Sequence, residues 1–131
     1  RYSLFMRYLS CKFFLILLSF QIIAETDNDN NFIHPIYANN YIGQIKVVCG
    51  KVKSTYINRK SRNDPLYLNF HKKYPFSPFT AIIWTKYSGD EFGSKPEKRL
   101  LNKKLCIKGL IEEYNGKPQI ILRYAEQIIE N

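Results

Sequence analysis

The feature that most constrains this chain is an Asn115-Gly116 pair between two strand-like segments within residues 104–128. Both residues of a two-residue hairpin turn must accept positive φ, and Asn-Gly is among the pairs that do so most readily. The pattern therefore predicts one antiparallel pair of strands. A similar segment, broken by a glycine, lies at residues 45–57, and a strand that contains Trp84 lies between the two. Several strands around a small barrel become the leading fold hypothesis.

The first residues have the pattern of a targeting signal. Arg7 and Lys12 precede an apolar run at residues 13–23, and Ala24 ends that run before a polar stretch. This order is typical of a secretory signal peptide. The run is also shorter than the ~17 to 25 residues that span a bilayer. We therefore predict a signal peptide over residues 1–24, cleavage that leaves no stable membrane anchor, and an exported protein that is periplasmic or secreted.

The residues after this predicted signal carry a clear positive charge. Residues 25–131 number 107, which suits a single domain, and they contain 17 basic and 11 acidic residues, a net charge of +6. A small basic exported domain attracts nucleic acid, anionic lipid, lipopolysaccharide or an acidic protein. Net charge alone does not choose among these partners.

The pattern along the chain predicts how the domain is organised. Residues 25–37 are expected to form a polar linker and entry segment, and residues 38–131 the folded domain. Alternation of apolar and polar residues predicts a first strand from Gly43 to residue 57, with a bulge or bend at Gly50. Two further strands are expected at residues 66–71 and 79–85, followed by a crossover at residues 87–102 with one short helix near Pro96.

This order of elements indicates the fold class. Three strands, a crossover with a helix, and a hairpin describe an all-β protein. Five strands with one short helix between the third and the fourth match the OB-fold, a partly open Greek-key barrel. The sequence thus predicts a five-stranded OB-fold barrel.

Several segments also resemble a known family. VCGKV, PLYLNF, FTAIIW and LCIKGLIEEYNGKPQI are similar to small bacterial exported OB-fold domains, which are related to those found beside secreted nucleases. The resemblance covers residues 38–128, and its motifs are strand and turn motifs that imply the fold far more than the function. In the implied fold, the strand with Cys106 pairs antiparallel with the strand with Cys49. An oxidising compartment permits one disulfide between them, and two small buried thiols are the alternative.

Catalysis is tested first because the resemblance lies close to nucleases. His34 and His71 have no obvious acidic partner, and the two cysteines lack the spacing of a zinc site. A thermonuclease-type site on such a barrel needs an acidic metal-binding loop, and here the loop at residues 58–65 offers only Asp64. We therefore expect no enzymatic activity, no metal and no cofactor.

Nucleic-acid binding is the sharper positive hypothesis. OB-folds bind oligonucleotides on the face of strands two and three, where cations contact phosphates and aromatic rings stack on bases. The predicted phosphate contacts are Arg59, Lys60, Arg62, Lys72 and Lys73, and the predicted base contacts are Tyr67 and His71. We expect weak binding of single-stranded nucleic acid without strong sequence preference.

Two alternatives stay open beside this hypothesis. Lysines on outward positions are usually a solvated face, and strand aromatics are usually core. The tight Asn115-Gly116 turn also leaves almost no loop between the last two strands, so one of the usual grasping loops is missing. The alternative function is an interaction module for an acidic protein or an envelope component, which would use the same barrel.

Overall fold

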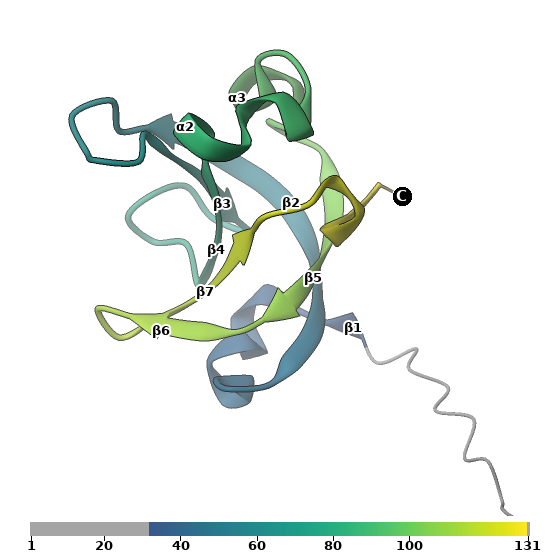
Figure 1. Ribbon diagram of the computed structural model, residues 1–131. Helices are drawn as coiled ribbons and strands as arrows, with labels where there is room; N and C mark the ends of the chain where they lie inside the picture. The colour runs from purple at the N-terminus through teal and green to yellow at the C-terminus, as the bar shows by residue number, and fades with distance from the viewer. Residues whose placement is uncertain (1–31, 131) are drawn as a thin grey trace, which may run out of the picture.

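The computed structural model describes residues 32–130, which form a mostly β structure (Figure 1). The strands are β1 (Phe32–Ile33), β2 (Ile45–Ile57), β3 (Pro65–Phe70), β4 (Phe79–Trp84), β5 (Lys104–Leu110), β6 (Glu112–Tyr114), β7 (Lys117–Leu122) and β8 (Ile128–Glu130). The short helical segments are η1 (Pro35–Tyr41), α2 (Thr85–Ser88), η2 (Gly89–Phe92), α3 (Pro96–Arg99) and η3 (Ala125–Gln127).

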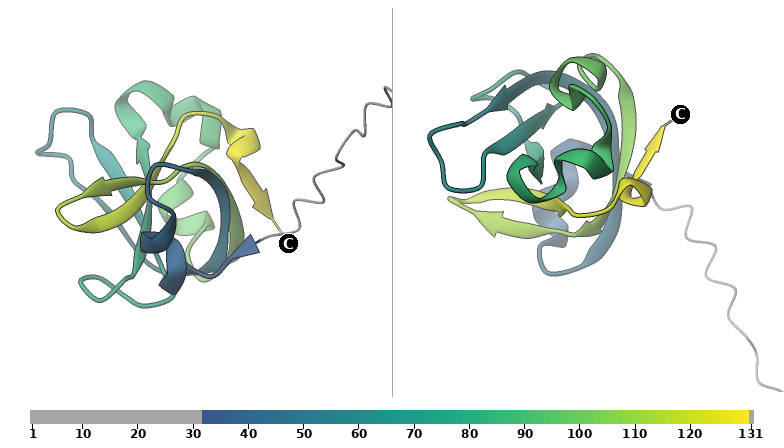
Figure 2. Two further views of the ribbon diagram at one scale, coloured as in Figure 1. Left: turned by 90° about the horizontal axis from the view of Figure 1, so that it is seen from below. Right: turned by 45° about the horizontal axis from the view of Figure 1, so that its top comes forward.

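One mixed sheet contains all of these strands. Its order is β6-β7-β4-β3-β2-β5-β8, and β1 pairs with β2 off this path. The β4–β7 and β1–β2 pairs are parallel, and the other pairs are antiparallel. The long strand β2 pairs with β5 along its first half and with β3 along its second half, so it curves through the molecule and joins both parts of the sheet (Figures 1 and 2).

The all-β class agrees with the expectation, whereas the strand count does not. The described residues form eight strands in an open sheet instead of five strands in a barrel. The predicted fourth strand is divided at Ile111, whose N–H donates to the Gln44 carbonyl at 3.0 Å and whose carbonyl accepts from Gly43 N–H at 2.7 Å. These bonds to the chain before β2 separate β5 from β6, and the short strands β1 and β8 add to the count.

The crossover between β4 and β5 also differs from the prediction of a single short helix. It holds three short helical segments, α2, η2 and α3. Gly93 and Lys95 have positive φ, at 77° and 47°. This left-handed backbone ends η2, and a new helical turn, α3, begins at Pro96. Pro96 does occupy the first turn of α3, where its missing N–H costs nothing.

The closing hairpin has the geometry that its turn residues predict. β6 pairs with β7 through Tyr114 opposite Lys117. The two residues between them, Asn115 and Gly116, have φ values of 50° and 76°. Both signs are those of a type I′ turn, which suits the twist of the flanking strands.

A bulge in β2 lies three residues later than predicted. Gly50 pairs with Leu105 in regular register, and the register shifts between Val52 and Ser54 instead. Gly50 has a different role, since a Cβ there would lie 2.6 Å from Cγ of Pro35 in η1. The extra residue at the bulge, Lys53, reverses which side chains of β2 face the core after this point.

The core is built from the inward side chains of all the longer strands. Phe70 and Phe79 are fully buried with ring centroids 5.3 Å apart. Leu100, the residue after α3, is buried in the same core cluster. At the other end of the sheet β5 lies close to β7, because a Cβ on Gly109 would sit 2.7 Å from Cγ2 of Ile120. Gln127 spans the same gap, with Nε2 donating to Lys108 O at 3.0 Å and to Ile121 O at 3.4 Å.

Cys49 lies directly opposite Cys106 in the β2–β5 pair, and a disulfide joins them. The first residues described, from the segment expected to be a linker and entry segment, form β1 and the start of η1. The predicted signal peptide at residues 1–24 lies outside the described residues. Within residues 32–130, no helix is long and apolar enough to cross a membrane.

Candidate functional site

Aromatic side chains gather on the outer side of the sheet where β2, β3, β4 and β7 run side by side. Leu66 and Leu68 of β3 are fully buried, so Tyr67 between them points outward. Its register partner on β2 is Tyr56, and the two rings are stacked, with centroids 6.4 Å apart and planes 14° apart. We call this surface the tyrosine face, defined by Tyr56, Tyr67, Trp84 and Tyr114.

The members of the tyrosine face differ in exposure. Tyr56 and Tyr114 are 61% and 63% exposed, whereas Tyr67 is half-buried between its neighbours. Burial raises the pKa of the Tyr67 hydroxyl, and the nearby hydroxyls of Tyr114 and Tyr56 raise this pKa further. Tyr67 is therefore a neutral phenol throughout the physiological pH range, and its hydroxyl keeps a proton to donate.

A polar row next to the tyrosines fixes the three central strands. Asn69 is 3% exposed, and its side chain donates to Ser54 Oγ and accepts from Thr80 Oγ1, both at 3.1 Å. Ser54 Oγ also accepts from the backbone N–H of Tyr74 at 3.0 Å. The row thus ties β2, β3 and β4 together and holds the loop that follows β3.

Trp84 extends the tyrosine face toward the end of β4. It is one strand position beyond the buried Ile83, so its half-exposed ring points outward. The Arg123 guanidinium lies over this ring, 5.9 Å from the centroid, within the range of a cation–π contact. This pair places a cation beside an aromatic ring. A site that binds both a phosphate and a base needs one group of each kind.

The predicted basic residues divide between the two ends of β3. Arg59, Lys60 and Arg62 are exposed in the loop before β3, and Lys72 and Lys73 are exposed in the loop after it. Six strand residues span about 20 Å. The two groups are thus not one cluster, and the tyrosines lie between them. Figure 1 shows both loops projecting on the side of the molecule that carries β3 and β4.

The loop after β3 adds aromatic surface of its own. Tyr74 and Phe76 are 75% and 76% exposed, and Lys117 Nζ of β7 donates to the Pro75 carbonyl at 2.8 Å. The contact connects this loop to the start of β7, next to the hairpin that carries Tyr114. The loop therefore borders the tyrosine face.

His71, predicted to contact bases together with Tyr67, lies elsewhere. It follows β3 with a φ of 72°, and its N–H donates to the Lys51 carbonyl at 2.8 Å. Its ring packs edge-on against His34, with centroids 4.8 Å apart. The structure thus brings His71 to the segment between β1 and η1, and does not bring it to Tyr67.

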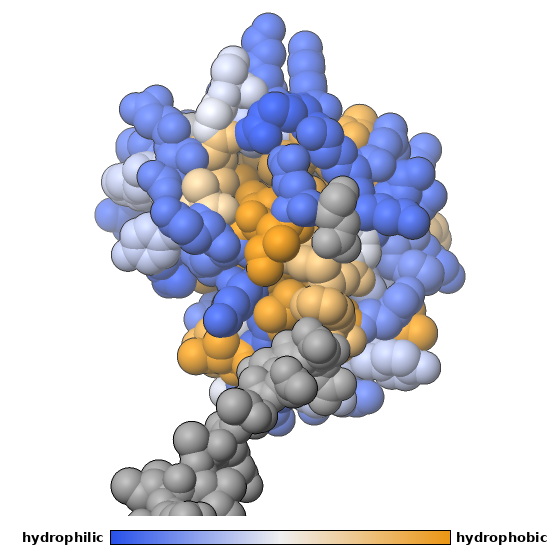
Figure 3. Space-filling view, turned by 90° about the vertical axis from the view of Figure 1, so that its right-hand side faces the viewer, coloured by the Kyte–Doolittle hydropathy of each residue, from blue (hydrophilic) through white to orange (hydrophobic). Residues whose placement is uncertain are grey.

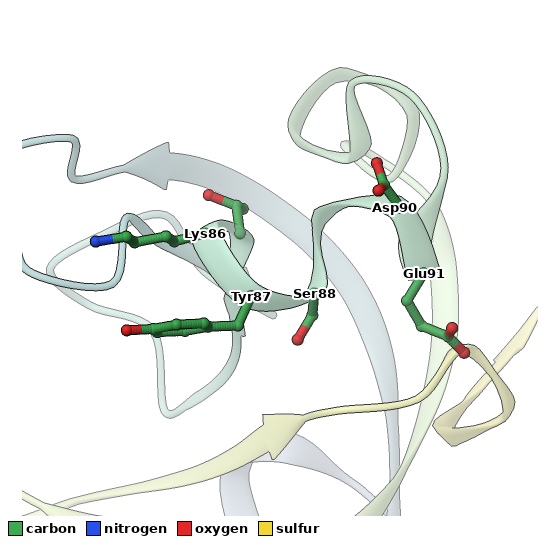
Figure 4. Close-up of a pocket in the computed structure, with 6 residues that line it drawn as sticks. Lys86, Tyr87, Ser88, Asp90 and Glu91 are labelled. Carbon is green, nitrogen blue, oxygen red and sulfur yellow. The ribbon is translucent and has the colours of Figure 1, made fainter.

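A shallow polar hollow of about 320 Å³ lies on the crossover, along α2 and η2. Figure 4 shows that its side chains diverge, with Lys86 and Tyr87 parallel on one side and Asp90 and Glu91 on the other. Glu91 Oε1 accepts from Ala125 N–H at 3.0 Å, which gives it a structural role. No acid–base pair converges in this hollow.

The described residues contain no group of three or more histidine, cysteine or acidic side chains placed to hold one metal ion. In the loop before β3, the Asp64 backbone is occupied: its carbonyl accepts from Thr85 Oγ1 at 2.7 Å and from Thr85 N–H at 3.2 Å. The groups that the tyrosine face and its neighbouring loops present are aromatic rings and cations.

Sequence reasoning missed Tyr56, Tyr114 and Arg123 as members of this surface. Regular alternation along residues 45–57 predicts that Tyr56 lies on the same side of the strand as Val52, and the bulge moves it to the other side. Tyr114 and Arg123 come to the face because β7 lies parallel to β4. In the sequence, the Asn115-Gly116 turn was the signal that could have located Tyr114, because it places Tyr114 at the end of a strand. Comparison of the sequence with protein-family models and with curated proteins finds no match.

Proposed function

We propose that this protein binds single-stranded nucleic acid on the tyrosine face, without catalysis. The observation that carries the proposal is the parallel stack of Tyr56 and Tyr67 on the outer side of the sheet, between two basic loops. Exposed aromatic rings supply stacking surfaces for bases, and flanking cations attract the phosphates. Both features are sequence-tolerant, so we expect weak discrimination among sequences.

We further propose that the sheet is an OB-type barrel. In this proposal β5 and β6 are one strand divided at Ile111, while β1 and β8 are additions at its ends. The order β2, β3, β4, β7, β6 and then β5 leads back to β2, because β5 pairs with the first half of β2. The close contact of Gly109 with Ile120 supports this return. The tyrosine face then occupies the part of the barrel where OB-folds bind oligonucleotides.

The charges on this side favour an anionic polymer. Among the described residues, ion pairs form only from Arg99 and Lys103, both to Glu130. The five cations of the two loops beside β3 thus have no acidic partner there. A strand of nucleic acid about 20 Å long would reach from one loop to the other across the tyrosines, which suits a site of about four or more nucleotides.

Fluorescence anisotropy with a labelled dT oligonucleotide tests the proposal. Affinity should fall steeply as salt rises, because bound cations release counterions. Tyr56→Ala should weaken binding about 5- to 150-fold, since stacking on one ring contributes ~1–3 kcal/mol. Tyr87→Ala is the matched control, because Tyr87 is 67% exposed on α2 and is not one of the four residues of the tyrosine face. It should leave affinity unchanged.

The charge reversal Lys60→Glu should lower both the affinity and the steepness of its salt dependence, by ~0.7 in slope for each phosphate that the protein no longer neutralises. No binding at 20 mM salt would reject the proposal. Equal weakening in the Tyr56 and Tyr87 variants would show binding elsewhere on the surface. Capture of an acidic protein in place of oligonucleotide would support the alternative, an envelope interaction module.

A further inference from the structure

A second exposed surface lies on the outer side of β1, β2 and β5. Side chains that point away from the core there include Ile45, 68% exposed, and its register partner Leu110, 45% exposed. Phe32 of β1, 59% exposed, lies beside Val47, and Ile129 of β8 lies beside Cys106. We call this surface the apolar face, defined by Phe32, Ile45, Val47, Leu110 and Ile129.

Apolar side chains gather on this side of the molecule. Figure 3 looks at the side that carries β5, and shows an apolar band bounded by hydrophilic side chains. Large exposed apolar areas on a soluble domain mark an interaction with a protein or a membrane. The charges at its border indicate which of the two this face suits.

Lysines border the apolar face, and acidic side chains are scarce there. Lys108 lies opposite Val47, and Lys51 lies opposite Lys104 in the same antiparallel pair. Like charges directly opposite each other on neighbouring strands are unfavourable, so this pair is stabilised when an anion approaches. The strands β1, β2 and β5 contain no aspartate or glutamate, and Glu130 of β8 already pairs with Arg99 and Lys103. The face is therefore cationic as well as apolar.

We propose that the apolar face docks onto an anionic lipid surface. Aliphatic side chains would enter the boundary between headgroups and acyl chains, while Lys51, Lys104 and Lys108 would contact lipid phosphates. Membrane-surface binding by a folded domain combines these two contributions. A second copy of this chain would bring its own three lysines against these three, and like charges would oppose that pairing.

The test uses the full chain and tryptophan quenching by lipids with brominated acyl chains. Native Trp84 reports on the tyrosine face. In the Trp84→Phe background, Leu110→Trp places the single tryptophan on the apolar face. With vesicles of one-third phosphatidylglycerol in phosphatidylcholine, the tryptophan at position 110 should be quenched strongly and Trp84 weakly. Partitioning through residues 1–31 would not depend on Lys104, so the Lys104 reversal below separates binding by the apolar face from binding by that segment.

Lys104→Glu tests the charge requirement. It replaces the like-charge pair with an opposite-charge pair, so folding is preserved. It should lower partitioning onto the anionic vesicles about 5- to 30-fold, a size set by reversing one lysine near the surface. Lys60→Glu makes the same charge change on the other side of the molecule and should have no comparable effect on quenching at position 110.

Equal quenching of the two tryptophans would overturn the proposal. Partitioning onto vesicles that changes neither with lipid charge nor with Lys104→Glu would also overturn it. A concentration-dependent dimer in sedimentation, with the tryptophan at position 110 shielded and unquenched, would overturn it in favour of a second copy. Ile45→Trp in the same background provides a second position, should Leu110→Trp disturb the strand. It should give the same contrast with Trp84.

Discussion

The two outer surfaces of this sheet share one strand and differ in almost everything else. The first half of β2 gives the apolar face aliphatic side chains, and the second half gives the tyrosine face Tyr56. The apolar face is fixed covalently, by the Cys49–Cys106 disulfide between β2 and β5. The tyrosine face is fixed by hydrogen bonds of buried polar side chains such as Asn69.

This contrast shows how a small sheet can carry two unlike surfaces. Aliphatic side chains on an exposed strand pair lack directional contacts, so a covalent link between the strands fixes their register. Aromatic side chains need a defined orientation to stack, and a hydrogen-bonded row beneath them supplies it. Each surface can thus be altered without the other, and the changes below exploit this independence.

The largest effect is expected from removing the disulfide. Replacing Cys49 and Cys106 with alanine should lower the free energy of unfolding by about 2–4 kcal/mol, because the link closes a long loop, with a sequence separation of 57. Urea denaturation followed by Trp84 fluorescence measures it. Oligonucleotide affinity of the folded fraction should stay within twofold. A decrease of less than 1 kcal/mol would contradict the stabilising role of the disulfide, and an affinity that falls in parallel would contradict the independence of the two surfaces.

A smaller effect is expected where β5 meets β7. Gly109→Ala should cost about 1–3 kcal/mol of stability, because the new methyl would lie 2.7 Å from Ile120 Cγ2 and the packed side chain has to move. Thermal or urea denaturation gives the value. In an Ile120→Ala background the same substitution should cost much less, since the space is then open. Equal costs in both backgrounds would show that this contact does not bring the strands together.

A still smaller effect is expected from Gln127, whose side chain spans the gap between β5 and β7. Gln127 accepts through Oε1 from Arg123 N–H at 2.7 Å and Tyr124 N–H at 3.0 Å, besides its contacts across the strands. Gln127→Leu should cost about 1 kcal/mol, because water can replace part of these exposed bonds. Hydrogen exchange at Arg123 and Tyr124 should accelerate, while Glu126→Ala, beside it on η3, should leave both amides protected. Unchanged exchange in the Gln127 variant would contradict this role.

The smallest effect concerns the pH dependence of the tyrosine face. The pKa of Tyr67 is raised in the folded protein by burial first and by its tyrosine neighbours second, above the unfolded value of 10.0. The folded state therefore holds this proton more tightly, so its contribution to stability is complete below pH 10 and is lost as pH rises through the folded pKa. Tyr67→Phe should flatten that alkaline loss of stability, which urea denaturation at a series of pH values measures. Identical curves above pH 10 would contradict the assignment.

The sequence predicts local features of this fold well. The Asn115-Gly116 turn and the outward direction of Tyr67 follow from turn chemistry and from the alternation of side chains along a strand, whereas the pairing of the strands with Cys49 and Cys106 was implied by the resemblance to OB-fold domains. These are short-range rules, or rules that a single register fixes. They were sufficient to place the candidate surface on β3.

Long-range features were not predictable from the same rules. The break at Ile111 depends on hydrogen bonds to residues 43 and 44, which no pattern within the strand indicates. The position of His71 depends on a contact with His34, 37 residues earlier in the chain. The outward direction of Tyr56 depends on where the bulge lies, and the prediction placed the bulge at Gly50 because glycine is common at bulges. In each case a contact between distant segments decided the outcome.

The bulge at Lys53 makes this position of β2 tolerant of a change in chain length. Val52 pairs with Phe70 and Ser54 pairs with Asn69, so a chain without Lys53 would continue the same register and keep Tyr56 opposite Tyr67. A one-codon deletion of Lys53 would therefore remove the bulge and leave the aromatic stack in place. Deletion of a regularly paired residue such as Thr55, with the bulge retained, would instead exchange the inside and the outside of the strand beyond it.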